Sequence, residues 1–143
     1  IDCTGDVPRI LRPGAITSEM IAESIGLKVV WQASDGAAVN SNAIRVSGSL
    51  EAHYAPAATV VLDQSPVAGQ GFIAMADVVA GEGVVRLAAP NSNDEFAQII
   101  YSALRAADQL GLEKVVVIQP QGDGIAIAIR DRLKRAAFGS AKN

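Results

Sequence analysis

The stretch EKVVVIQP, residues 113–120, decides the fold that the sequence predicts. Its centre is the unbroken apolar run Val115–Ile118. A strand with one face in water alternates apolar and polar residues, whereas an unbroken run is typical of a strand buried on both faces. Such strands occur in parallel sheets that helices cover, so the run predicts a buried strand of an α/β domain.

Helical patterns lie on both sides of this strand. Upstream, Ser92 and Glu95 have the spacing of a capping box, and Gly111 ends the helix that they begin. Downstream, a second helix follows the glycines 122–124. The apolar faces of the two helices are Phe96, Ile99, Ile100, Ala103, Leu104 and Ala107 in the first, and Ile125, Ile129, Leu133 and Ala136 in the second.

Three further strands are predicted before the first of these helices. They are Ala58–Asp63, Gly71–Ala76 and Gly83–Ala89, and glycines bound the last two. The order is therefore strand, strand, strand, helix, strand, helix. That order predicts a Rossmann-like open α/β sheet with helices packed on it.

The first 30 residues form a separate unit. The opening IDCTGDVPRILRPG predicts strand, turn, strand, with Arg9–Leu11 as the second strand and Cys3 as a small apolar filler in the first. A helix follows, capped by Thr17 and ended by Gly26, with a partial apolar stripe. A hairpin alone is only marginally stable, so we expect its sheet to continue in residues outside this chain. The chain is then the C-terminal part of a longer protein. The partial apolar stripe of the helix between Thr17 and Gly26 consists of Ile16, Met20, Ile21 and Ile25.

Residues 31–57 predict a linker. They are rich in Ser, Asn, Ala and Gly, and they sustain neither a helical nor a strand period. At roughly 3.3 Å per residue they could span up to about 90 Å. Trp31 and Tyr54 each offer a large ring for burial, which argues against plain disorder. The predicted organisation is 1–30, 31–57 and 58–143.

Composition excludes several functions. The chain has 143 residues, 50% of them hydrophobic, and a net charge of −3. That charge and 4% aromatic residues argue against nucleic-acid binding by this segment. One histidine and one cysteine cannot form a zinc site without distant carboxylates, and no apolar run approaches the roughly 18 residues of a membrane span. The single cysteine fits a reducing compartment.

Two groups of residues are candidates for binding. Arg12 ends a strand beside Pro13 and Gly14, where its planar fork could meet a phosphate or a carboxylate, although it could equally be a surface arginine. His53 and Tyr54 precede Pro56, which favours an extended backbone that could lie across a surface. The alternative for this pair is a linker held by packing.

The glycine pairs GQG, GEG and GDG match neither the dinucleotide nor the P-loop pattern. Gly122–Gly124 lie between a buried strand and a helix start, where an anion could bind. Asp123 would repel an anion, and we expect it to cap the helix instead. No GxSxG nucleophile elbow is present, so a Ser-His-Asp triad has no support from a motif.

Taken together, these segments resemble the L-threonylcarbamoyladenylate synthase family, which is YrdC-like, in its long two-domain form. The stretches IDCTG and ILRPGAIT resemble the end of its catalytic domain, and SGSLEAHYAP resembles its linker motif. NDEFAQIIYSALRAADQLG and GDGIAIAIRDRLKRAA resemble its accessory C-terminal domain. RPGAIT and HYAP occurring together make the resemblance specific.

The resemblance implies a nucleotidyltransferase that condenses L-threonine, bicarbonate and ATP into threonylcarbamoyl-AMP and pyrophosphate, for tRNA threonylcarbamoyladenosine modification in the cytoplasm. It implies that Arg12 contacts ATP and that the linker folds over the catalytic cleft, with nucleotide contacts from Tyr54 and His53. Mg²⁺ would accompany ATP, and the tRNA-modification machinery would be the partner.

The family's catalytic core precedes the strand with which this chain begins. We therefore expect the chain alone to be inactive, with no catalytic residue of its own, no metal ligand and no direct RNA contact. Two other interpretations stay open. One is a non-catalytic α/β module that binds a small ligand or a protein, and the other is an RNA-binding protein.

Overall fold

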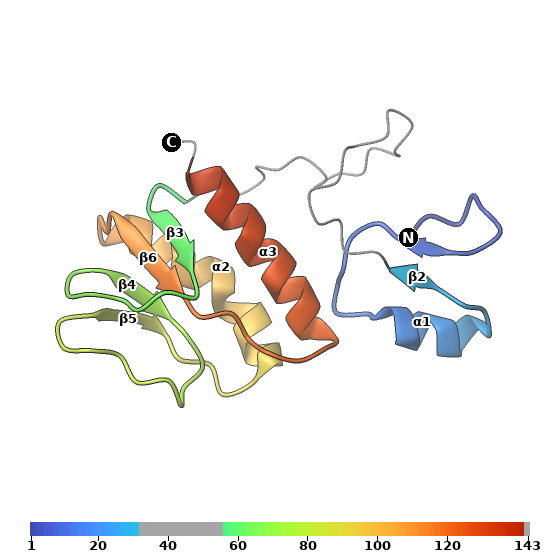
Figure 1. Ribbon diagram of the computed structural model, residues 1–143, viewed down its shortest axis with the longest axis horizontal. Helices are drawn as coiled ribbons and strands as arrows, with labels where there is room; N and C mark the ends of the chain where they lie inside the picture. Colours follow the sequence, from blue (N-terminus) through green and yellow to red (C-terminus); the bar gives the residue numbers. More distant parts are fainter. Residues whose placement is uncertain (32–55, 142–143) are drawn as a thin grey trace.

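The structure is a computed structural model and describes residues 1–31 and 56–141 (Figure 1). Within these residues, β1 and β2 form a two-stranded sheet, and four strands form a second sheet in the order β3-β6-β4-β5. Neighbouring strands are parallel in both sheets. The elements are β1 (Arg9–Ile10), α1 (Ser18–Ile25), β2 (Val30–Trp31), β3 (Thr59–Leu62), β4 (Gly71–Ile73), β5 (Val85–Ala88), α2 (Asn93–Gln109), β6 (Lys114–Val117) and α3 (Ile125–Ser140).

The predicted buried strand is β6, and it lies inside the larger sheet between β3 and β4. Val115 stands opposite Val60 on one side and Gly71 on the other. Val115, Val116 and Val117 are at most 1% exposed. Burial of each such side chain stabilises the fold by roughly 1.5–3 kcal/mol, so this strand is the centre of the core.

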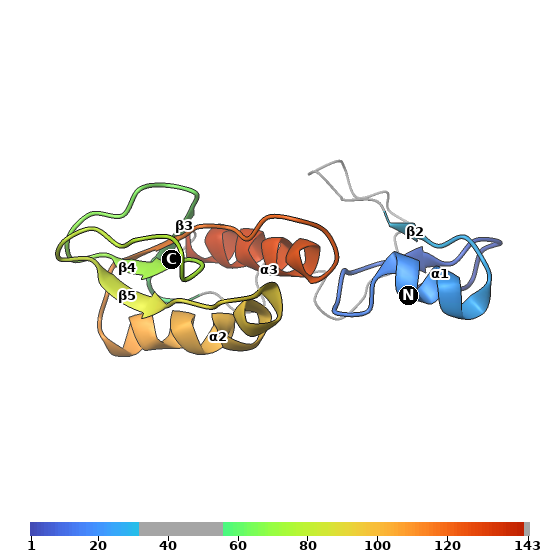
Figure 2. The same cartoon turned by 90° about the horizontal axis from the view of Figure 1, so that it is seen from below.

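Both helices of this domain pack on the same face of the sheet. Val115 and Val117 contact a cluster that contains Ile100 of α2 and Leu133 of α3. Figure 2 shows α2 along one side of β4 and β5. On the other face, Val116 and its neighbours are covered by the 74–84 loop. The predicted open α/β sheet is confirmed, and its helices share one face because the β3–β4 and β4–β5 connections contain no helix.

The start of α2 follows the predicted capping chemistry. The Ser92 hydroxyl accepts a hydrogen bond from the Glu95 amide at 3.2 Å. The Glu95 carboxylate accepts one from the Asn91 amide at 2.7 Å. Gly111, just beyond the helix, has φ +66°, a left-handed conformation that favours glycine. The capping and ending residues predicted for this helix are therefore confirmed.

The start of α3 differs from its prediction. Its N-cap is Gly124, and no side-chain hydrogen bond caps the helix. Asp123 is exposed, and its backbone carbonyl, not its carboxylate, accepts a hydrogen bond from Ala126. The prediction that Asp123 caps this helix was wrong. The left-handed φ of Gly122 (+99°) and Gly124 (+63°) directs the chain into the helix without a capping side chain.

The first 31 residues form a small βαβ unit. β1 and β2 are parallel, with Arg9 opposite Val30, and α1 connects them. Thr17 caps α1 and Gly26 ends it, as predicted. The sequence did not predict β2, because two residues are too few to show a period. Cys3 is exposed and lies outside the named strands, so its expected role as a strand filler was wrong.

The apolar stripe of α1 exists, and of its four residues only Ile21 is partly buried. Ile16 at its start is 64% exposed, Met20 is 55% exposed and Ile25 is 47% exposed. No residue of α1 is buried. Contiguous exposed apolar surface usually marks a contact site, so this face lacks its partner among the described residues.

A half-buried arginine fastens the 74–84 loop to the sheet. The guanidinium of Arg86 lies 4.8 Å from the centre of the Phe72 ring. Burial lowers the pKa of Arg86 from its ordinary value, yet an arginine remains charged at neutral pH. Its Nε, Nη1 and Nη2 atoms donate four hydrogen bonds of 2.7–2.8 Å to the carbonyls of Ala74, Met75, Val78 and Ala88.

Close packing at Gly71 leads to the first prediction. A Cβ at this position would lie 2.7 Å from Cδ1 of Leu87 and 3.1 Å from Cγ2 of Val115. We expect Gly71→Val to lower the free energy of unfolding by about 1–3 kcal/mol through overpacking. Gly81→Val is the matched control, since the nearest atom to its Cβ, in Val84, is 3.8 Å away. Urea unfolding measures both; equal effects would contradict the packing described.

The second prediction concerns Arg86. Arg86→Met removes four hydrogen bonds and leaves their carbonyl acceptors partly buried, so we expect it to lower the free energy of unfolding by roughly 2–3 kcal/mol. Arg132→Met is the control, because Arg132 donates to the Ala128 carbonyl of its own helix. Its cost should stay below about 1 kcal/mol. A neutral Arg86→Met in chemical denaturation would show that the loop does not depend on this side chain.

Candidate functional site

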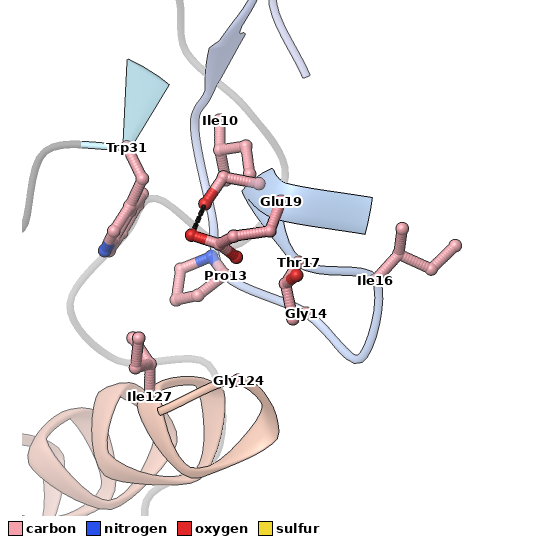
Figure 3. Close-up of a pocket in the computed structure, with 10 residues that line it drawn as sticks. Ile10, Pro13, Gly14, Ile16, Thr17, Glu19, Trp31, Gly124 and Ile127 are labelled. Atoms are coloured by element: carbon pink, nitrogen blue, oxygen red, sulfur yellow. Dashed lines mark hydrogen bonds between the residues drawn. The ribbon is translucent and has the colours of Figure 1, made fainter. Parts of the chain in front are cut away.

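A small cavity lies between the N-terminal unit and the first turn of α3 (Figure 3). From the N-terminal unit it is lined by Pro13, Thr17 and Trp31, among others, and from α3 by Gly124 and Ile127. Its volume is about 20 Å³, which is room for roughly one water molecule. The two parts of the chain therefore face each other here across a small, partly open cleft, which we call the seam.

The turn RPG, residues 12–14, connects β1 to α1 at the carboxyl end of β1. In α/β units the loops at the carboxyl ends of strands form the binding sites, so this turn lies where a ligand is expected. Pro13 and Gly14 line the seam. The sequence predicted Arg12 in a turn beyond a strand, and the structure places it there.

Arg12 has an unusual side chain. Its Nε is buried and has no hydrogen-bond partner among the residues that the structure describes. A buried donor without an acceptor costs free energy, and a phosphate or carboxylate oxygen would supply the missing acceptor. Arg86 contrasts with it, because that guanidinium is held by four carbonyls. Among the described residues, Arg12 thus has a buried guanidinium donor that is left to bind an anion.

Polar groups at the start of α1 also line the seam. The Thr17 hydroxyl accepts a hydrogen bond from the Met20 amide at 3.3 Å. The Ser18 hydroxyl donates to Oε1 of Glu19 at 2.9 Å (Figure 3). Hydrogen bonds from the Thr17 side chain, from the Glu19 amide and from Ser18 lower the pKa of Glu19. Glu19 therefore carries a negative charge at neutral pH and does not itself bind an anion.

Of the three predicted site residues, the structure describes only Arg12. His53 and Tyr54 lie outside the described residues, so their place beside Arg12 remains a prediction. Trp31, the residue before the first undescribed position, ends β2 and lines the seam. Gly124 and Ile127 were missed as neighbours of the RPG turn. No local pattern signals a contact between residues so far apart in sequence.

A second polar group lies at the carboxyl edge of the larger sheet. Asp63 follows β3 with φ +54°, and its carboxylate accepts hydrogen bonds from the Gln119 amide at 2.8 Å and from Gln119 Nε2 at 2.6 Å. The buried Gln119 Oε1 has no partner within the described parts of the chain. Because Gln119 donates one hydrogen bond to each oxygen of Asp63, this pair joins the ends of β3 and β6.

Residues 1–31 and 56–141 contain no group of three or more His, Cys, Asp or Glu side chains that could hold a metal ion. The expectation that Mg²⁺ accompanies ATP is not tested by this finding and stays a prediction. In the same residues, no helix is long and apolar enough to cross a membrane.

The third prediction separates a binding arginine from a structural one. Because Arg12 Nε has no partner to lose, Arg12→Met should leave the free energy of unfolding within about 0.5 kcal/mol of wild type or raise it. Trp31 is the only tryptophan, so its fluorescence follows unfolding of this unit. A loss as large as that predicted for Arg86→Met would show that Arg12 is structural.

The comparisons with known proteins agree on one family. The family described as "Threonylcarbamoyl-AMP synthase, C-terminal domain" matches residues 16–138. The chain is 27% identical over 157 aligned residues to threonylcarbamoyl-AMP synthase of Bacillus subtilis (strain 168), covering 97% of the chain and 44% of that protein. It is 26% identical over 161 residues to the Pyrococcus abyssi (strain GE5 / Orsay) enzyme, covering 96% and 44%. The chain thus spans less than half the length of these relatives.

Solved structures share the fold. The crystal structure of P. abyssi Sua5 complexed with L-threonine has a TM-score of 0.73 at 23% identity, over 97% of this chain and 45% of that one. A P. abyssi Sua5 structure in which a histidine and the tyrosine after it are changed to alanine has a TM-score of 0.66 at 18% identity, over 97% and 44%. At these identities the likeness shows the fold alone. With the family match over most of the chain, the conclusion is that this chain belongs to the threonylcarbamoyl-AMP synthase family and corresponds to the C-terminal part of its members.

Proposed function

We propose that this chain is part of a threonylcarbamoyl-AMP synthase. That enzyme condenses L-threonine, bicarbonate and ATP into threonylcarbamoyl-AMP and pyrophosphate for tRNA modification. The chain supplies the RPG turn, the linker and the accessory domain. The observation that carries the proposal, beside the family match, is the partnerless Nε of Arg12 in a turn at a strand's carboxyl end. A guanidinium there suits a phosphate group of ATP.

In this reaction the amino group of threonine and bicarbonate form an N-carboxylate (carbamate) with loss of water. An oxygen of that carbamate attacks the α-phosphorus of ATP, and pyrophosphate leaves. Negative charge develops on the phosphate oxygens as the new bond forms. A fixed guanidinium beside those oxygens stabilises that charge more than it stabilises the ground state. Arg12 is the residue of this chain that we assign to that contact.

The linker acts as a cover in this proposal. The product is a reactive acyl adenylate, which water would hydrolyse, so the cleft needs shielding. The only histidine of the chain, His53, is followed directly by Tyr54, and the solved P. abyssi variant has a neighbouring histidine and tyrosine replaced. His53 follows Trp31 by 22 positions, so up to about 70 Å of chain is available to return over the RPG turn. Tyr54, and secondarily His53, would contact the nucleotide.

The exposed stripe of α1 supports the proposed organisation. Ile16, Met20 and Ile25 lack cover in the structure, whereas relatives more than twice as long have further residues to supply it. We assign residues 1–30 to the end of a catalytic domain, 31–57 to the linker and 58–143 to the accessory domain. Without the rest of that catalytic domain the chain has no complete active site, so alone it should not make the adenylate.

The remaining parts of the proposal concern the cellular compartment, the metal ion and the partner proteins. We place the reaction in the cytoplasm, which a chain with a single cysteine suits. Mg²⁺ would arrive on the phosphates of ATP, as it does in other nucleotide enzymes. The net charge of −3 favours a role in which other proteins of the tRNA-modification machinery, not this segment, contact RNA.

The fourth prediction tests Arg12 and Tyr54 in the whole protein, extended to its natural start. We expect Arg12→Ala to lower ATP- and threonine-dependent pyrophosphate release by about 10²–10³-fold, the usual effect of removing one donor to a developing charge. Tyr54→Ala should lower it by about tenfold, and His53→Ala by less. The matched control is Arg132→Ala, which loses one hydrogen bond within α3 and should keep full activity.

Two results would contradict the proposal. A whole protein that releases no pyrophosphate would favour the non-catalytic binding module, and L-threonine or ATP binding by calorimetry would then be the remaining test of that module. An active protein indifferent to Arg12→Ala would remove the RPG turn from the site.

A further inference from the structure

We propose that the first turn of α3 is a positioning contact for the RPG turn, with Ile127 as its central residue. The accessory domain would then act on the reaction by holding Arg12 in place. This inference rests on the proposed function. It assigns to Ile127 a role in the site although Ile127 touches no substrate.

Ile127 is the first observation behind the inference. It is half-buried, but it belongs to neither of the two apolar clusters that form the core of the accessory domain. Figure 3 shows it directed into the seam, below Trp31 and Pro13. These residues line the same small cavity. The N-terminal unit therefore faces Ile127 across the cavity.

Gly124 is the second observation. It combines φ +63° with ψ −125°, a conformation that residues with a Cβ rarely adopt. A Cβ on Gly124 would lie 3.8 Å from Cγ2 of Thr17, in ordinary contact. The starts of α3 and α1 therefore abut. Thr17 is joined to the RPG turn by Ala15 and Ile16, so a shift of α3 would move the turn that carries Arg12.

The accessory domain braces the segment that enters α3. Asp63 holds Gln119 by two hydrogen bonds, Asn93 of α2 donates to the Gln121 carbonyl at 3.3 Å, and Arg130 of α3 donates to the Pro120 carbonyl at 2.8 Å. Three separate elements thus fix the chain between β6 and α3. A residue on the first turn of α3 is held rigidly enough to position what rests on it.

The size of the cavity indicates a packing contact and not a ligand pocket. Its volume of about 20 Å³ holds no substrate, and most of its named walls are apolar. The apolar side chains of Ile127, Pro13 and Trp31 therefore form a packing surface between two parts of one chain. A small displacement of such a contact can lower the rate of a reaction by about tenfold or more, because the reacting groups lose alignment.

The test compares Ile127→Asp with two other variants. An acidic residue in the first turn of a helix is favourable, and α3 has none there, so Ile127→Asp should leave the helix intact. Ile127→Val is the conservative variant. Val79→Asp makes the same chemical change at a side chain that is 88% exposed, far from the seam in sequence and in fold.

Two readouts are measured on these variants. In this chain, Trp31 emission should shift to the red in Ile127→Asp and stay unchanged in Val79→Asp, with circular dichroism unchanged in both. In the whole protein, Ile127→Asp should lower kcat by about tenfold with a smaller change in the KM for ATP, because a displaced Arg12 loses its alignment with the reacting phosphate. Ile127→Val, which keeps an apolar side chain in the seam, should keep kcat and the KM for ATP within about twofold of wild type.

Each result decides the inference. Unchanged Trp31 emission would show that the contact is absent. A shifted emission with an unchanged kcat would show a contact without a positioning role, which also overturns the inference. If the wild-type whole protein released no pyrophosphate, the proposed function would fail and the positioning role with it, while the Trp31 measurement would still report on the contact.

Discussion

The burial of β6 on both of its faces is the constraint on which the rest of the structure depends. Val115 and Val117 require a layer of helices on one side, and Val116 requires cover on the other. Parallel pairing with β3 and β4 then aligns the carboxyl ends of these strands at one edge. The chain leaves β6 at that edge and enters α3 there, so the position of Gly124 follows from the burial of three valines.

The N-terminal unit is held by a different balance. Its two-stranded sheet and eight-residue helix bury little apolar surface of their own, and α1 keeps its apolar stripe exposed. Small units of this kind are marginal without added contacts. The seam with α3 supplies one such contact within this chain. The apolar stripe points to a second contact, which the described residues do not supply.

Local chemistry made much of the fold predictable. Ser92 and Thr17 cap the helices that they were expected to cap, and Val115–Val117 form the expected buried strand, because each depends on neighbours within a few residues. Contacts that depend on topology were not predictable. Examples are the bond from the Val60 amide to Ser140 Oγ and the pairing of Asp63 with Gln119. Asp123 failed as a cap because two left-handed glycines already set the path of the chain.

The candidate site likewise has a part that local sequence predicted and a part that it did not. The RPG sequence predicted Arg12 in a turn after a strand, since proline and glycine act locally. Its role toward ATP, and those of Tyr54 and His53, came from resemblance, because a single sequence does not show which distant residues share a cleft. The seam with Ile127 became visible only once the sheet had placed α3 beside α1.

A crystal structure of the whole protein with ATP and L-threonine is the measurement that tests this account most directly. The account predicts a guanidinium nitrogen of Arg12 within hydrogen-bond distance of a phosphate oxygen, while Ile127 packs against Pro13 and Trp31. An Arg12 side chain directed away from the nucleotide, or an α3 separated from the RPG turn in the ligand-bound state, would contradict it.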